Sequence, residues 1–172
     1  HVVIENGANG NRVSNCYFYD GVGDRRTPAV KIEDSNDCEV SYNELRNWDG
    51  RGIQLLLKGD KNTGGKGMKS CERTHVHHNY IHDFPQPAKK SNSGDCLQSG
   101  HYSGTTYVET GAIFEYNLVH DCNKDNEALS VKSSGNIIQF NTFTSMKKAT
   151  VQVRHGTDNK LIANWVENTL GM

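Results

Sequence analysis

The sequence lacks several features that would place it in a familiar class of protein. No apolar run approaches the ~18 to 20 residues that a membrane-spanning helix requires. The net charge is only −1, so the overall charge does not favour nucleic acid or an anionic membrane as a partner. Proline is scarce, at 3 residues, whereas glycine is frequent, at 17. With a hydrophobic fraction of 34%, this composition favours a fold of many short strands joined by tight turns.

The cysteines do not form a recognisable framework. There are five of them and no CxxC pair, at Cys16, Cys38, Cys71, Cys96 and Cys122. Buried cysteines commonly serve as small apolar residues, so we expect buried free thiols. One or two disulfides remain open as an alternative, because spacing alone does not give the pairing.

Six segments of the chain share one pattern: an apolar residue, then three positions later an Asn (a Cys in the first segment), then a second apolar residue two positions further. The fourth position of these segments is Cys16, Asn43, Asn79, Asn117, Asn141 and Asn164, in steps of 27, 36, 38, 24 and 23 residues. A repeat of this length is typical of a solenoid, in which each coil buries its apolar face against the next. Asn at the same bend of each coil can form a ladder of amide hydrogen bonds, and it tolerates the left-handed conformation of a sharp bend.

A second series of segments alternates apolar and polar residues with period two, which is the pattern of strands with one buried face. The residues expected to point into the core are Val30, Ile32, Ile53, Leu55, Leu97, Ser99, Leu129, Val131, Val151 and Val153. We predict an all-β fold, a right-handed parallel β-helix (a solenoid) of about six coils, as one domain over residues 1–172 within a longer domain. The long steps predict loop insertions at one corner, over residues 58–73 and 84–94. The alternative is an antiparallel sandwich.

Two cations occupy equivalent positions in the last two strands of this series. Aligning residues 129–132 with 151–154 gives an offset of 154 − 132 = 22 residues, about one coil. Lys132 and Arg154 should therefore point outward from neighbouring strands, roughly 4.8 Å apart along the helix axis. Adjacent cations repel, so this arrangement indicates an anionic substrate.

Oxygen donors are expected to gather beside these cations. Matching Leu97 with Leu129 places Asp95 beside Glu127, and Asn92 and Asp125 lie just upstream of these two residues. Carboxylate and amide oxygens suit Ca²⁺ better than a transition metal. An ordinary cluster of turn residues is the alternative.

A uronic-acid polymer would give this constellation a chemical role. Cleavage by β-elimination removes the poorly acidic proton at C5, and a cation bound to the neighbouring carboxylate stabilises the charge that develops. Lysine can act as the base when neighbouring positive charge favours its neutral form. Arginine stays protonated, so its roles are to hold the carboxylate, to stabilise charge or to relay a proton to the leaving oxygen.

The segments DNEALSVKSSGNIIQFNTF and VQVRHGTDNKLIANW resemble the catalytic region of polysaccharide lyase family six, which contains alginate lyases and enzymes of the chondroitinase B type. Asp125-x-Glu127, Lys132-Ser133 and Arg154-His155-Gly156 match its motifs. HHNYI and NSGDCLQSG resemble two further strands of that family. The resemblance covers about residues 75–168.

This resemblance implies a Ca²⁺ ion held by Asn92, Asp125 and Glu127. It also implies that Lys132 is the base that takes the C5 proton and that Arg154 aids departure of the leaving group. Asp125 and Asp95 each stand where the family commonly has Glu, and Gln98 stands where it commonly has Arg. The residues expected to contact substrate are Asp95, Gln98, His101, Tyr102, His155 and His78.

The run THVHHNYIH could also suggest zinc. Strand alternation would place His77 and His78 on opposite faces, however, so we expect one of them to line the substrate groove instead. Tyr102 or Tyr107 is expected to stack on a sugar ring, because both follow the predicted metal-binding strand.

The sequence thus predicts a polysaccharide lyase that uses Ca²⁺ to cleave an anionic polysaccharide, alginate first and dermatan or chondroitin sulfate second. The alternatives are a uronan C5-epimerase, whose Asp-Pro-His-Asp type of motif we do not find, and a non-catalytic carbohydrate-binding β-helix. The chain begins with His1 and shows no signal sequence, so we expect a processed or partial form of a secreted or periplasmic protein. Open coil ends could support an oligomer.

Overall fold

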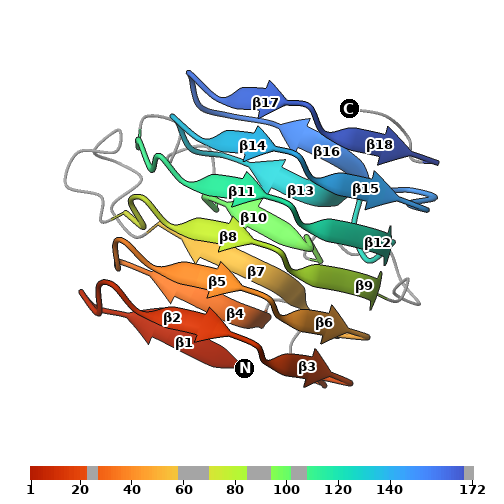
Figure 1. The fold of residues 1–172 in the computed structure, drawn as a ribbon, viewed down its shortest axis with the longest axis horizontal. Helices are drawn as coiled ribbons and strands as arrows, with labels where there is room; N and C mark the ends of the chain where they lie inside the picture. Colours follow the sequence, from red (N-terminus) through yellow and green to blue (C-terminus); the bar gives the residue numbers. More distant parts are fainter. Residues whose placement is uncertain (23–26, 58–69, 85–93, 102–107, 169–172) are drawn as a thin grey trace.

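The computed structural model describes residues 1–22, 27–57, 70–84, 94–101 and 108–168. These residues form three parallel sheets of six strands each, which wind around a common core as a parallel β-helix (Figure 1). The described part contains no helix that is long and apolar enough to cross a membrane. The predicted all-β fold is confirmed.

Each coil contributes one strand to each sheet. Sheet A consists of β1 (Val2–Glu5), β4 (Pro28–Glu33), β7 (Arg51–Leu56), β10 (Leu97–Ser99), β13 (Glu127–Val131) and β16 (Thr150–Val153). Sheet B consists of β2 (Arg12–Ser14), β5 (Glu39–Ser41), β8 (His75–His77), β11 (Ile113–Glu115), β14 (Ile137–Gln139) and β17 (Lys160–Ile162). Sheet C consists of β3 (Tyr17–Tyr19), β6 (Glu44–Arg46), β9 (Tyr80–Phe84), β12 (Leu118–Cys122), β15 (Thr142–Thr144) and β18 (Trp165–Glu167).

The core follows the predicted register. Leu97 pairs with Ile53 on one side and with Leu129 on the other, and Leu129 pairs with Val151. These four side chains are at most 3% exposed, so they form a continuous apolar column. Val153, also expected inside, is 42% exposed because β16 is the edge strand of sheet A among the described residues.

The predicted asparagine ladder is present at the bend between sheets B and C. The side-chain oxygen of Asn117 accepts hydrogen bonds from the backbone N and the Nδ2 of Asn79, at 3.0 and 2.9 Å. Asn117 in turn donates from its backbone N and its Nδ2 to the side-chain oxygen of Asn141, at 3.0 and 2.9 Å. The same contacts link Asn43 to Asn79 and Asn141 to Asn164. The ladder therefore holds successive coils at one spacing.

The left-handed conformation expected of these asparagines is found instead in the residue that precedes each of them. The residue before each ladder position has the left-handed conformation, with φ between 49° and 56°, and these residues are Asn15, Tyr42, His78, Tyr116, Phe140 and Ala163. A residue such as Tyr or Phe enters this region at a cost of about 1 kcal/mol or more. The ladder hydrogen bonds on the following residue compensate that cost and keep the bend in place.

The two long insertions do not share a corner. The first lies between β7 of sheet A and β8 of sheet B, and the second lies between β9 of sheet C and β10 of sheet A. They therefore interrupt two different corners of the coil. The number of residues between ladder positions could not show whether the insertions share a corner, because each interval contains all three corners of a coil.

Candidate active site

A cavity of about 510 Å³ lies on the outer face of sheet A, over β10, β13 and β16. Its volume falls in the range of about 300 to 1,000 Å³ that is usual for ligand sites. The described residues that line it are Arg51, Asp95, His101, Asp125, Asn126, Glu127, Lys132, Gln152 and Arg154. The cavity therefore brings together the predicted catalytic residues, Lys132 and Arg154, and the two predicted metal ligands that the structure describes, Asp125 and Glu127.

Lys132 and Arg154 lie on neighbouring strands, as their offset predicted. The backbone N of Lys132 donates to the Ser99 carbonyl at 2.7 Å, and that of Arg154 donates to the Val131 carbonyl at 2.9 Å. These bonds continue the ladders of sheet A one residue beyond β13 and β16. The sheet itself therefore sets the spacing between the two cations.

A carboxylate separates the two cations. Glu127 Oε1 lies 2.7 Å from Arg154 Nη1, and Glu127 Oε2 lies 3.6 Å from Lys132 Nζ. Lys132 is 8% exposed overall, whereas the Arg154 side chain is 48% exposed. The buried amine and the accessible guanidinium thus share one counterion, which offsets the repulsion expected between them.

Asp95 lies two residues before β10, as Glu127 lies two residues before its neighbour Leu129, and it is 3% exposed. The pKa of Asp95 is raised to about 7, chiefly by burial and also by the nearby charges of Glu127 and Asp125, which together outweigh the lowering effects of Lys132 and Arg51. The carboxyl is held in place by Gln98, whose Nε2 donates to Asp95 Oδ2 at 2.5 Å. Three carboxyl groups thus gather in one cavity, beside the cations Arg51, Lys132 and Arg154.

Gln98 does not line the cavity itself. Its side-chain oxygen accepts a hydrogen bond from Gln54 Nε2 on the adjacent strand. Arg51 Nε approaches Asp95 Oδ2 at 3.5 Å from the same side. Gln98 therefore positions Asp95 rather than facing the cavity.

The turn that carries Asp125 is tied down at two points. Asp125 Oδ2 accepts a hydrogen bond from the backbone N of Gly94 at 3.1 Å. The side chain of Lys124, only 4% exposed, passes across Gly94 and forms an ion pair with Asp49. A Cβ on Gly94 would lie 1.9 Å from Lys124 Cγ, so only glycine fits there.

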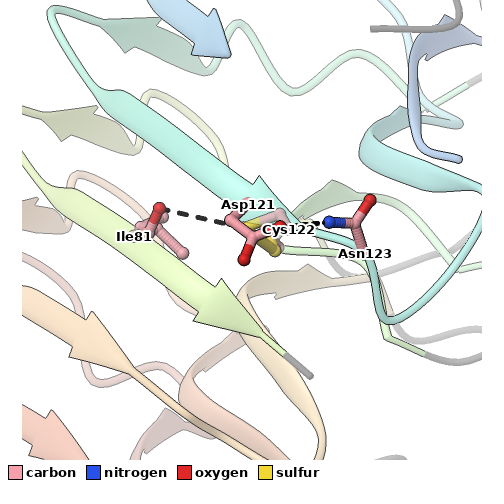
Figure 2. Close-up of a disulfide and its surroundings, with 5 residues drawn as sticks. Ile81, Asp121, Cys122 and Asn123 are labelled. Carbon is pink, nitrogen blue, oxygen red and sulfur yellow. Dashed lines mark hydrogen bonds between the residues drawn. A yellow bond between two sulfur atoms is a disulfide. The ribbon is translucent and has the colours of Figure 1, made fainter. Parts of the chain in front are cut away.

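A disulfide between Cys96 and Cys122 braces the same region (Figure 2). Cys96 follows Asp95 directly, and Cys122 ends β12 just before the turn to Glu127. Both cysteines are 1% exposed. The expectation of buried free thiols is thus wrong for this pair and holds for Cys38 and Cys71. The remaining free cysteine, Cys16, is exposed, because its ladder position begins the column.

The chemistry of the cavity fits a hard cation. Asp95, Asp125 and Glu127 supply only oxygen donors, the kind that Ca²⁺ prefers. Within the described ranges, however, no three His, Cys, Asp or Glu side chains converge on a single point suited to a metal ion. Asn92, the third ligand implied by the family resemblance, lies outside the described residues.

The remaining predicted contact residues are divided among three places. His101 lines the cavity. His155 follows Arg154 and donates its backbone N to the Val131 carbonyl at 3.2 Å, but it is not among the described lining residues. Tyr102, like Tyr107, lies outside the described residues.

His78 lies at the bend between sheets B and C, away from the cavity lining. Its ring stacks on Tyr42 at 4.9 Å and lies 5.1 Å from the ring of Tyr116. Its Nδ1 is 2.8 Å from Nδ1 of His77, so the two rings are not on opposite faces as alternation suggested. The reason is that β8 ends at His77 and His78 has a φ of 53°, which breaks the alternation.

Three lining residues were not singled out from the sequence: Arg51, Asn126 and Gln152. Arg51 could have been found by extending the register. Ile53 pairs with Leu97, and Arg51 and Asp95 both precede these partners by two residues. Gln152 follows from the same logic, because it pairs with Ser130 between two inward positions.

Comparisons with known proteins identify the family of the chain. The family model described as Chondroitinase B matches residues 1–169. No curated protein matches the chain. Because the match spans almost the whole sequence, the chain belongs to the chondroitinase B family of polysaccharide lyases, a type of polysaccharide lyase family six.

Proposed function

We propose that this protein cleaves a uronic-acid-containing anionic polysaccharide by β-elimination. The observation that carries the proposal is the arrangement of Lys132 and Arg154 around Glu127 in one cavity. A buried amine next to an accessible guanidinium provides a base and an anion-binding group on the same face. Family membership supports the same class of reaction.

In the proposed reaction, the amine of Lys132 takes the proton from C5 of the uronate. The electron pair of that C–H bond forms the C4–C5 double bond as the C4–O bond breaks, and the leaving oxygen receives a proton from a solvent water, with Arg154 aiding its departure. Arg154 binds the uronate carboxylate and stabilises the charge that develops at the reacting carbons. Burial of Lys132 excludes water from its amine and keeps the base close to the substrate.

A Ca²⁺ ion is part of the proposal. Asp125 and Glu127 would hold it together with Asn92, and Asp95 is close enough to contribute charge. When bound, such an ion supplies positive charge next to the substrate carboxylate, which makes the C5 proton more acidic. The three carboxyl groups that gather in the cavity support this part of the proposal.

The substrate is proposed to be alginate or a dermatan or chondroitin sulfate. The sequence motifs led us to place alginate first, and the name of the matching family favours the second group. The two differ in sulfate esters but share the uronate whose C5 proton is removed. The protein is further proposed to act in a secreted or periplasmic setting, where such polymers are met.

The test is to incubate the protein with alginate and with dermatan sulfate and to follow the ultraviolet absorbance of the unsaturated uronate. Lys132→Ala and Arg154→Ala should each lower kcat at least about 100-fold, the scale of a lost acid–base group. Lys160→Ala, on the exposed strand β17, is the matched control and should leave kcat unchanged. EDTA should abolish activity, and added Ca²⁺ should restore it.

Three outcomes would count against the proposal. Absence of unsaturated product on every uronate polymer would reject the lyase reaction, and a changed uronate stereochemistry without cleavage would instead indicate an epimerase. Full activity in Lys132→Ala would reject that residue as the base. Full activity after thorough chelation would remove Ca²⁺ from the reaction.

A further inference from the structure

A second cavity, of about 400 Å³, continues the first along sheet A. Arg51 and His101 line both cavities, so the two share a wall. The second extends toward β4, where it is lined by Lys31 and Pro28. The outer face of sheet A therefore carries one elongated groove rather than an isolated site.

The two halves of this groove differ in charge. The first cavity has three carboxylates among its described lining residues, in addition to its cations. The described lining of the second cavity contains the cations Lys31 and Arg51, the histidines His1 and His101, and no Asp or Glu. The second half thus presents cationic rather than carboxylate side chains to a ligand, although two carboxylates stand behind Lys31.

Lys31 is held in a defined place in this second half. Its Nζ lies 2.5 Å from Glu33 Oε2 and 3.5 Å from Glu5 Oε2, and its side chain is 20% exposed. An ammonium group has three protons, of which these two carboxylates take two. The third proton can be donated to a ligand oxygen. Because the carboxylates already hold the lysine side chain in place, less of its conformational entropy is lost when it does so.

The spacing between the two halves fits a polymer. Lys31 lies on β4 and Lys132 directly follows β13, so they are three strand steps apart through β7 and β10. At ~4.8 Å for each step, this is roughly 14 Å along the helix axis. A single sugar cannot span that distance, whereas a chain of a few sugars can.

We propose that Lys31, together with Arg51, forms a second anion-binding subsite, which holds a carboxylate or sulfate ester of the same polysaccharide chain several sugars from the bond that is cleaved. This inference rests on the proposed lyase function and adds a determinant of substrate length and charge. Arg51 is positioned by Asp95, so it connects the subsite with the reacting centre.

The test compares wild type, Lys31→Gln and Lys31→Arg on size-fractionated uronate oligosaccharides, from trisaccharide to octasaccharide. Loss of one partly buried charge contact predicts a KM about 3- to 10-fold higher for Lys31→Gln on the longer oligosaccharides. Its kcat, and its KM on the trisaccharide, should equal those of wild type. Lys31→Arg keeps the charge and should keep a KM close to that of wild type. Lys160→Gln serves as a control for the loss of one surface charge.

Separate arms with alginate and dermatan sulfate oligosaccharides distinguish the two anions. An effect of Lys31→Gln in both arms assigns the subsite to carboxylate, and an effect in the dermatan sulfate arm alone assigns it to sulfate ester. An unchanged KM at every length, or an equal rise on the trisaccharide, would overturn the subsite while leaving the lyase function intact. Failure of wild type to cleave any oligosaccharide would overturn the proposed function and the subsite with it.

Discussion

Replacement of Asn117 by alanine tests how much of the fold depends on the asparagine ladder. The side chain of Asn117 takes part in four hydrogen bonds: it donates to the Val76 carbonyl and to Asn141 Oδ1, and it accepts from the backbone N and the Nδ2 of Asn79. Asn117 is 1% exposed, so water cannot replace these partners. All four bonds are lost in Asn117→Ala, and a buried N–H of Asn79 and the carbonyl of Val76 lose a partner.

The expected loss of stability follows from the number of hydrogen bonds that are lost. At about 1 kcal/mol for each hydrogen bond, the free energy of unfolding should fall by about 4 kcal/mol. That is a large share of the roughly 5 to 15 kcal/mol that stabilises a typical domain. With a urea m-value of about 2 kcal/mol/M, the midpoint of urea unfolding should fall by about 2 M.

Alanine variants of two further asparagines provide a comparison for the stability of Asn117→Ala. Asn164 lies at the edge of the ladder and is half-buried, where it accepts two bonds from Asn141 and donates one to Ile138. Asn164→Ala should cost about half as much as Asn117→Ala. Asn11 makes two side-chain bonds on the exposed surface, so Asn11→Ala should change stability by at most about 0.5 kcal/mol. A cost for Asn117→Ala no larger than that for Asn11→Ala would refute the claim that the ladder holds the coils together.

Three further predictions concern the neighbourhood of the site and the pH dependence of the fold. Gly94→Ala should cost about 1 to 3 kcal/mol by overpacking against Lys124, and the double variant Gly94→Ala/Lys124→Ala should cost less than the sum of the single variants in thermal unfolding; strict additivity would contradict the clash. Removal of the Cys96–Cys122 disulfide, which closes a separation of 26 residues, should lower the free energy of unfolding by about 3.5 kcal/mol in urea titrations, and equal stability with and without reductant would contradict this. Burial lowers the pKa of His77 below its usual 6.5, so the unfolded chain gains a proton before the folded one and stability is lost as the pH falls below 6.5. His77→Gln should therefore show a smaller fall in Tm over that range, and an unchanged slope would exclude His77 as the cause.

The pairing of β13 with β16 in sheet A could be predicted from the sequence, because no long insertion interrupts the chain between these two strands. The 22-residue offset between Lys132 and Arg154 appears in the structure as the pairing of Leu129 with Val151 and of Val131 with Val153. Alternation of apolar and polar residues fixes which side chains face the core, since a slip of one residue would expose the whole column. The cation pair could be placed for this reason without any knowledge of the other sheets.

Contacts across long separations could not be predicted in the same way. Lys124 and Asp49 are 75 residues apart, and their ion pair spans two insertions of unequal length. The disulfide depends on Cys96 directly preceding β10 of sheet A and on Cys122 ending β12 of sheet C. This relation becomes visible only when the corners of the coil are assigned. The spacing between ladder positions gives the length of a coil but not the lengths of its three sides.

The alternation within sheet A also explains how one sheet carries a packed core on one face and a polar groove on the other. Between the inward residues of successive strands stand Lys31, Gln54, Gln98, Ser130 and Gln152, which pair in one row across the sheet. Apart from Lys31, this row is uncharged, and its middle members Gln54, Gln98 and Ser130 are at most 3% exposed. The charged residues flank the row instead, because Arg51, Asp95 and Glu127 lie at or before the beginnings of strands β7, β10 and β13, and Lys132 and Arg154 follow the ends of β13 and β16. A polysaccharide in the groove would therefore meet these charged residues together with Lys31 and Gln152. The buried middle of the row serves instead to hold the neighbouring strands and Asp95 in place.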